Sequence, residues 1–264
     1  IRKDENKMTQ TTDNHKCGII IQARTNSSRL PNKMILPFYE GKGILQLLLE
    51  RIMHSMAGIP VIVATTESKS DDTICHVAEE CGCDTFRGDE QDVLSRFIGA
   101  AGTYGLDRVI RICADNPFLD MASLARITAM LRDGGKDYYA YATSDGTPTM
   151  KTHYGFWCEG VTVAALQKAS LLTSDKPYHE HVTNYIYAHP EIFSLQLLRI
   201  PEELEQNKRI RLTLDTAQDF EMQKQIYRET MSCGGITIDN VMKVLQASPR
   251  YYETMEQQIR KNTK

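Results

Sequence analysis

The segment of residues 19–33 constrains this chain more than any other. Three β-branched residues, Ile19 to Ile21, lead into a polar loop that carries Arg24, Arg29 and Lys33. A buried strand that feeds a basic loop at the carboxyl edge of a sheet is a common place for a polyphosphate. Arginine binds phosphate oxygens through its planar fork, and lysine binds them as a point charge. The loop lacks the glycine patterns of P-loops and dinucleotide-binding turns. The alternative is a surface loop whose charges only face water.

The segment IIQARTNSSRLPNK closely resembles the first motif of the acylneuraminate and 3-deoxy-manno-octulosonate cytidylyltransferases. It most closely resembles their spore-coat polysaccharide branch. The resemblance implies a Rossmann-like nucleotidyltransferase fold of the GT-A type. It also implies transfer of CMP from CTP to an acidic sugar, with Mg²⁺ as cofactor. In that family, the residues at the positions of Arg24, Arg29 and Lys33 hold the triphosphate. The positions of Ala23 and Ser28 contact the nucleotide.

Composition excludes several other classes of protein. The formal net charge of -3 argues against a general nucleic-acid binder. The apolar runs are far too short to cross a membrane, and the polar N-terminus shows no secretory signal. The seven cysteines include no CxxC pair, so we expect reduced, mostly buried thiols in a cytoplasmic protein rather than a zinc site.

Apolar runs alternate with amphipathic stretches in the first half of the chain, which predicts an α/β fold with a mostly parallel sheet and helices on both faces. We expect strands at residues 18–23, 60–65, 85–86 and 108–112. We expect helices at residues 45–56, 71–81, 92–104 and 121–131. Asp71 and Asp92 suit helix N-termini, where a carboxylate accepts hydrogen bonds from unpaired amides.

The second half predicts a less regular, mixed α/β arrangement. We expect strands at 137–143, 193–200 and 209–214, and a mobile loop at 144–152. Helices are expected at 161–169, 178–189, 219–230 and 238–246. The domain organisation that follows is a disordered lead-in at 1–16, a single nucleotidyltransferase domain at 17–250 and a polar, fraying tail at 251–264. Residues 137–200 break the βαβ rhythm and carry aromatic residues, which favours this region for homodimerisation and acceptor binding.

Two further motifs resemble nucleotide-contacting parts of the family. The strand ending in Ala64 and Thr65, followed by Asp71, matches a stretch that lies beside the nucleotide base. The segment from Phe86 to Arg96 matches "FRGxxxDVLxR", which implies base or phosphate contacts for Arg87 and a close backbone approach at Gly88. The alternatives are an ordinary connection from strand to helix for the first motif and a surface or salt-bridging role for Arg96.

Two aspartates are the candidates for holding Mg²⁺. Asp115 follows an apolar strand and precedes Pro117, within a segment that begins at Arg111 and resembles "RxTGDCPLID". Mg²⁺ is usually held by one or two carboxylates together with phosphates and waters. Asp215 lies in a segment that resembles "RLTVDTPEDFE", where the family places its second metal-binding carboxylate. The alternatives are a turn-initiating role for Asp115 and helix capping for Asp215. We interpret Asp219 as a helix N-terminal charge.

The acceptor region is indicated by a third group of residues. Glu180 and His181 begin a segment that resembles "EHVTPYIxxHPE", which implies sugar contacts, although a lone histidine on a helix is more often structural. Glu159 is retained from a "GLDVE" motif in which Trp157 replaces the aspartate, so the resemblance does not fix which sugar is the acceptor. The cluster of Tyr138, Tyr139 and Tyr141 is expected to pack in the core rather than to floor the pocket.

The sequence therefore predicts a cytoplasmic, homodimeric CTP:acidic-sugar cytidylyltransferase of surface polysaccharide biosynthesis, with no nucleic-acid or membrane partner. Its catalytic residues would be Arg24, Arg29, Lys33, Asp115 and Asp215. Arg111 would also contact the nucleotide. Two alternatives remain: another nucleotide-sugar pyrophosphorylase or glycosyltransferase of the same fold, although its glycine-rich loop or DxD motif is absent, and a non-catalytic nucleotide-binding subunit.

Overall fold

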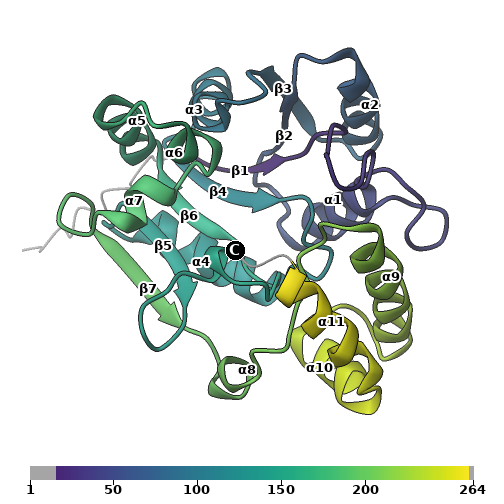
Figure 1. The fold of residues 1–264 in the computed structure, drawn as a ribbon. Helices are drawn as coiled ribbons and strands as arrows, with labels where there is room; N and C mark the ends of the chain where they lie inside the picture. Colours follow the sequence, from purple (N-terminus) through teal and green to yellow (C-terminus); the bar gives the residue numbers. More distant parts are fainter. Residues whose placement is uncertain (1–15, 262–264) are drawn as a thin grey trace, which may run out of the picture.

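The fold is built on one seven-stranded sheet with the strand order β3-β2-β1-β4-β6-β5-β7 (Figure 1). The computed structural model describes residues 16–261, so residues 1–15 of the expected lead-in lie outside the described part. The strands are β1 (Cys17–Gln22), β2 (Val61–Thr66), β3 (Asp84–Gly88), β4 (Arg108–Cys113), β5 (Tyr138–Ala142), β6 (Glu159–Thr162) and β7 (Leu195–Arg199). Neighbouring strands are parallel, except that β6 runs antiparallel to both β4 and β5. The expected mostly parallel sheet is confirmed.

Helices cover both faces of this sheet. Side chains alternate along β1, so Ile19 and Ile21 join one core cluster while Ile20 joins the other. The first cluster is covered by α1 (Ile44–Ser55), α2 (Asp72–Glu80), α4 (Met121–Asp133), α9 (Ala217–Ser232), α10 (Ile238–Ala247) and α11 (Arg250–Lys261). The second is covered by α3 (Val93–Thr103), α5 (Val163–Leu172) and α7 (Asn184–Ala188). Short helices α6 (Lys176–Glu180) and α8 (Glu202–Gln206) and two 3₁₀ turns, η1 (Lys69–Asp71) and η2 (Thr149–Lys151), complete the order.

The first half follows the predicted βαβ rhythm, with each expected strand and helix present and its bounds shifted by a few residues. Asp92 caps α3 as expected, because its side chain accepts a hydrogen bond from the Ser95 amide at 2.8 Å. Asp71 precedes α2 but its side chain makes no capping bond there. None of the helices within residues 16–261 is both long and apolar enough to span a membrane.

The predicted strand at 209–214 is wrong. This segment is buried and extended, but it has no partner in the sheet. Its amides bond to two different loops instead, with Leu212 N donating to His153 O at 2.7 Å and Leu214 N donating to Asp115 O at 3.1 Å. An extended segment of alternating polar and apolar residues satisfies its backbone equally well in this way, so the pattern alone could not distinguish the two arrangements.

Two predicted helices in the second half need correction. The segment 161–169 begins as strand β6, and α5 starts only at Val163, after Thr162 caps it by accepting from the Ala165 amide at 3.2 Å. The segment 178–189 is two short helices, α6 and α7, separated by a turn in which Val182 has a φ of 50°. A β-branched residue rarely adopts this left-handed conformation, so the turn is a strained feature.

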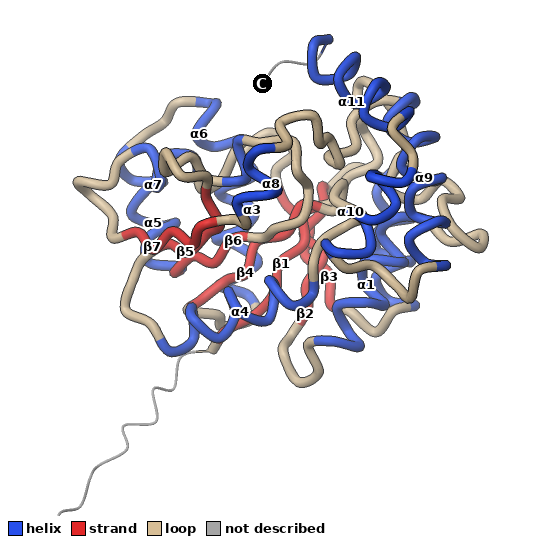
Figure 2. Tube along the Cα trace, turned by 90° about the horizontal axis from the view of Figure 1, so that it is seen from below, coloured by secondary structure: helices blue, strands red, loops and turns tan. Residues whose placement is uncertain are grey.

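The expected fraying tail is helix α11 as far as Lys261. Its Tyr251, Tyr252, Met255 and Gln258 are buried, while the remaining face is polar. This three-to-four-residue spacing is typical of an amphipathic helix, and the high content of charged residues concealed it. Figure 2 shows α11 gathered with α9 and α10 at one side of the molecule.

Candidate active site

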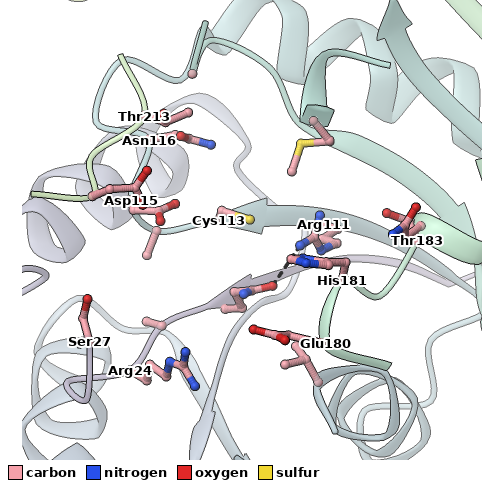
Figure 3. A pocket seen from close by; sticks show the side chains of 18 of the residues that line it. Arg24, Ser27, Arg111, Cys113, Asp115, Asn116, Glu180, His181, Thr183 and Thr213 are labelled. Atoms are coloured by element: carbon pink, nitrogen blue, oxygen red, sulfur yellow. Dashed lines mark hydrogen bonds between the residues drawn. The ribbon is translucent and has the colours of Figure 1, made fainter. Parts of the chain in front are cut away.

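A cavity of about 840 Å³ opens at the carboxyl ends of β1 and β4 (Figure 3). Its walls come from the loop after β1, the loop after β4, the turn between α6 and α7, the η2 region and the segment before α9. The predicted site residues that line it are Ala23, Arg24, Ser28, Arg29, Lys33, Arg111, Asp115, Glu180, His181 and Asp215. The fold thus brings together charged residues from four separate motifs.

Asp71 holds the loop after β1 in place through hydrogen bonds. This carboxylate accepts hydrogen bonds from the amide and hydroxyl of Thr25 at 2.8 and 2.6 Å. It also accepts from the hydroxyls of Thr65 and Thr66, at 2.8 and 2.6 Å. Burial opposes ionisation of Asp71, but these hydrogen bonds outweigh it and lower its pKa. Asp71 therefore ties the end of β2 to the basic loop.

Lys33 lies between the two candidate metal ligands. Asn32 adopts a φ of 60°, a left-handed conformation that asparagine tolerates, at the turn that precedes Lys33. The Lys33 Nζ lies 3.1 Å from Asp115 Oδ2 and 3.9 Å from Asp215 Oδ1, and it donates to Leu214 O at 2.5 Å. Asp115 and Asp215 are a hundred residues apart in the chain, yet they converge on one ammonium group.

Asp215 is held by two arginines as well. Arg29 Nη2 lies 3.0 Å from Asp215 Oδ1, and Arg211 Nη2 donates to Asp215 Oδ2 at 2.9 Å. Burial opposes ionisation, but Lys33, Arg29 and Arg211 outweigh it and lower the pKa of Asp215. Arg211 is fully buried and also binds both oxygens of Asp219, at 3.1 and 3.0 Å. Asp219 forms a capping box with Thr216, so its predicted role at the N-terminus of α9 is confirmed.

The oxygen atoms near these aspartates fit a divalent metal of the magnesium type. Asn116 Oδ1 and Thr213 Oγ1 are buried and have no hydrogen-bond partner among residues 16–261. Both residues line the cavity beside Asp115 (Figure 3). Two carboxylates and two neutral oxygens are hard ligands of the kind that Mg²⁺ prefers.

Five predicted contact residues do not reach the cavity: Ala64, Thr65, Arg87, Gly88 and Glu159. Ala64 and Thr65 are buried in β2, where Thr65 supports Asp71. Arg87 does not line the cavity and forms an ion pair with Asp72 at 2.6 Å. It lies on β3, which β2 separates from β1 and from the cavity. In this structure these residues do not form the surface of the cavity.

Glu159 is fully buried behind the cavity wall. It accepts from Arg111 Nη1 at 2.6 Å and from Thr183 Oγ1 at 3.0 Å, and it also bonds the Tyr138 hydroxyl. Arg111 and Thr183 both line the cavity, and Arg111 also donates to Gln22 Oε1 at 3.1 Å. Glu159 therefore positions two residues of the wall and cannot itself meet a ligand in this conformation.

The acceptor region contains both predicted and unpredicted features. Trp157 lines the cavity and stacks on Tyr141, with ring centroids 5.5 Å apart. Tyr138, Tyr139 and Tyr141 are buried and do not line the cavity, as expected. The expected mobile loop 144–152 contributes η2 and Thr152 to the wall.

Several wall residues were missed by the sequence reasoning: Asn116, Thr183, Asn184, Tyr187 and Thr213. Arg51 was also missed, although it supports the loop after Asp115 by donating to Pro117 O at 2.9 Å and Leu119 O at 2.5 Å. Asn116 and Thr213 had a usable signal, because they lie within two residues of the two aspartates in sequence, and Thr183 had one as part of the segment that begins at Glu180. Burial raises the pKa of the Cys17 and Cys83 thiols to about 11, which makes them poor nucleophiles.

Comparison with known proteins assigns this arrangement to a family. The family model described as cytidylyltransferase matches residues 18–260. The chain belongs to the cytidylyltransferase family. This family agrees with the resemblance seen in the sequence, and the chain is therefore a nucleotidyltransferase.

Its relatives include an uncharacterised protein of Methanocaldococcus jannaschii, 35% identical over 88% of this chain and 90% of the relative. The spore coat polysaccharide biosynthesis protein SpsF of Bacillus subtilis is 30% identical over 87% of this chain and 94% of its own length. Among solved structures, a cytidylyltransferase from Leptospira borgpetersenii superposes with a TM-score of 0.78 and 29% identity, over 90% of this chain and 97% of that one. This cytidylyltransferase-family chain thus spans nearly the full length of these three proteins.

Proposed function

We propose that this protein transfers CMP from CTP to an acidic sugar and releases pyrophosphate. The observation that carries the proposal is that Lys33 and Arg29 of the basic loop meet Asp115 and Asp215 inside one cavity. The two positive side chains can bind the phosphate oxygens of a triphosphate. The two carboxylates can bind a metal ion that is itself bound to the phosphates. Both lie at the carboxyl edge of the sheet, the usual ligand position in α/β folds.

In the proposed reaction an acceptor oxygen attacks the α-phosphorus of CTP. The bond between the α-phosphorus and the bridging oxygen then breaks, and pyrophosphate leaves with its electron pair. Such a step depends on positioning and charge neutralisation more than on covalent catalysis by the protein. Arg24, Arg29 and Lys33 bind the triphosphate oxygens, with Ala23 and Ser28 beside them in the same loop.

Asp115 and Asp215 would hold Mg²⁺. The ion, when bound, neutralises phosphate charge and polarises the reacting phosphoryl group. Lys33 has to yield its contacts with the two carboxylates, and the phosphates of CTP offer its ammonium group new acceptors. Arg211 keeps Asp215 ionised and oriented throughout, because it is buried and also bound to Asp219.

The acceptor would occupy the part of the cavity bounded by Trp157, Glu180, His181 and Thr183. An acidic sugar of surface polysaccharide biosynthesis is proposed by family resemblance. Composition supports a cytoplasmic protein that acts without nucleic acid or membrane, with a single catalytic domain within residues 17–250. The break of the βαβ rhythm at residues 137–200 supports a homodimer.

Release of pyrophosphate, measured with a panel of nucleotides and acidic sugars in the presence of Mg²⁺, tests the proposal. We expect release with CTP and one class of acidic sugar, and its loss in Asp215→Asn. Equal turnover of UTP or dTTP would contradict CTP specificity. Binding of CTP with no release for any acceptor would instead favour a non-catalytic subunit.

A further inference from the structure

Arg96 is the charged residue that the segment 86–96 contributes to the cavity. It lies near the start of α3, and both Arg96 and Val93 line the cavity wall. Its side chain is almost entirely buried, with 2% of its surface exposed. Arg87 and Gly88 of the same motif do not line the cavity. The motif therefore contributes a buried guanidinium group to the site, at a position not included among the predicted contacts.

The surrounding residues are arranged to admit this side chain. A Cβ atom on Gly88 would lie 3.2 Å from Arg96 Cγ and 3.1 Å from the Phe86 ring, so the absence of a side chain at Gly88 gives Arg96 its space. Arg96 Nη1 donates to the carbonyl of Asp89 at 2.8 Å. This bond fixes the guanidinium through a neutral acceptor, and the carboxylates of Asp71, Asp89 and Glu90 attract it only from beyond ion-pair distance.

Arg96 lacks the partners that the other buried arginines of the site possess. Arg111 is paired with Glu159 at 2.6 Å, and Arg211 with Asp219 at 3.0 Å. Within residues 16–261, no carboxylate forms such an ion pair with Arg96, and its buried Nε has no hydrogen-bond partner. Burial, and then the charge of Arg24, lower the pKa of Arg96. Arginine still remains protonated, and a buried charge is costly unless it is paired.

We propose that Arg96, together with Arg24, forms an oxyanion-binding subsite in the cavity. Arg24 lines the same cavity, has a half-exposed side chain, and lies 4.0 Å from its nearest carboxylate partner, Glu90, so it can turn to a ligand. Two guanidiniums suit a planar or tetrahedral oxyanion, either a phosphate of the nucleotide or the carboxylate of an acidic acceptor. The identity of the natural ligand rests on the proposed function, whereas the subsite itself does not.

The arginine Nε–H signals in ¹H–¹⁵N spectra of the full chain test this subsite directly. The Nε–H signal of Arg96 is identified as the one that is missing from the spectrum of the Arg96→Lys variant. We expect this signal to shift and saturate with inorganic pyrophosphate if the ligand is a phosphate, or with lactate alone if it is a carboxylate. Sodium chloride at equal ionic strength should leave it unchanged. No saturable shift with either oxyanion would overturn the proposal.

Calorimetry on variants supplies the second measurement. Arg96→Met should weaken binding of the active oxyanion at least tenfold, while Arg126→Met, which removes an exposed arginine on α4, should leave it unchanged. A folded Arg96→Met protein with unchanged affinity would refute the subsite, and the wild-type spectra decide the matter if that variant does not fold. Absence of CTP-dependent pyrophosphate release alongside a shifted Arg96 signal would count against the proposed function alone.

Discussion

At the scale of residues, the cavity is a set of charges that hold one another in place. Lys33 neutralises Asp115 and Asp215, and Arg29 and Arg211 add two further positive charges around Asp215. Because every carboxylate at this end of the cavity already has a cation, the site can fold with like charges close together. The same cations become available to phosphates when CTP and a metal enter.

Arg29→Ala should weaken CTP binding roughly ten- to hundredfold. The residue is half-exposed in a loop, so the fold should survive, and a charge-assisted contact of this kind contributes about 1.5–3 kcal/mol. Calorimetric titration with CTP measures the change, with Arg126→Ala as the matched exposed control. If CTP binding and turnover both stayed at the wild-type level, the loop would be only a solvated surface feature.

Asp71→Asn should lower the free energy of unfolding by at least about 1.5–3 kcal/mol, the contribution of one hydrogen bond to a charged acceptor. The amide group of asparagine would face hydroxyl and amide donors from Thr25, Thr65 and Thr66. Urea unfolding measures this, with the exposed Asp133→Asn as control. An equal stability of the two variants would show that Asp71 does not anchor the loop.

The pH dependence of the Asp71 contribution follows from its lowered pKa. The stabilisation is fully present above the ordinary aspartate pKa of about 3.9, and it is lost as the pH falls through the lower folded-state value. The stability difference between wild type and Asp71→Asn should therefore be constant near neutral pH and shrink only in acid. A difference that already shrinks above pH 5 would contradict this.

The sequence predicted those site residues that lie in the loops after strands, such as Lys33 and Asp115, because strand ends meet at one sheet edge. It could not predict partners that depend on long-range pairing. Glu159 and Arg111 are directly opposite each other on β6 and β4, so their ion pair depends on a strand that the pattern did not reveal. Arg96 was ambiguous for a similar reason, since its burial depends on the packing of Gly88.

At the scale of elements, several of the failures fall on short elements, whereas the longer helix α11 was missed because its many charged residues concealed its period. The four-residue strand β6 and the five-residue helices α6 and α7 are too short to show a period. The turn at Val182, between α6 and α7, brings both His181 and Thr183 to the cavity wall. The irregular second half is thus the part of the fold that shapes the acceptor side of the cavity.

Helix α11 should be required for stability. Met255 is fully buried in the first core cluster, so Met255→Ala should cost about 2–5 kcal/mol. Glu253→Ala, on the exposed face of the same helix, should change the free energy of unfolding by less than about 0.5 kcal/mol. Thermal or urea unfolding compares the two. A Met255→Ala protein as stable as wild type would restore the interpretation of this segment as a frayed tail.

At the scale of the whole molecule, we expect a homodimer that uses the region 137–200. Leu171 and Leu172, at the end of α5, are 88% and 48% exposed, so this region offers adjacent apolar side chains for such an interface. Light scattering at micromolar concentration should give twice the chain mass, and Leu171→Lys should shift the protein towards the monomer. A wild-type monomer would rule out this assembly.

The central claim is that Asp115 and Asp215 together hold one metal ion under the triphosphate, and the effect of Mg²⁺ on CTP affinity tests it most directly. Calorimetry with and without Mg²⁺ would compare wild type, Asp115→Asn, Asp215→Asn, the double variant and the exposed control Asp133→Asn. We predict at least tenfold tighter CTP binding with Mg²⁺ in wild type and control. Each single variant should lose this gain, and the double variant should lose no more, because either substitution already disables the shared ion. A single variant that keeps the full Mg²⁺ effect, or losses that simply add, would contradict the shared site.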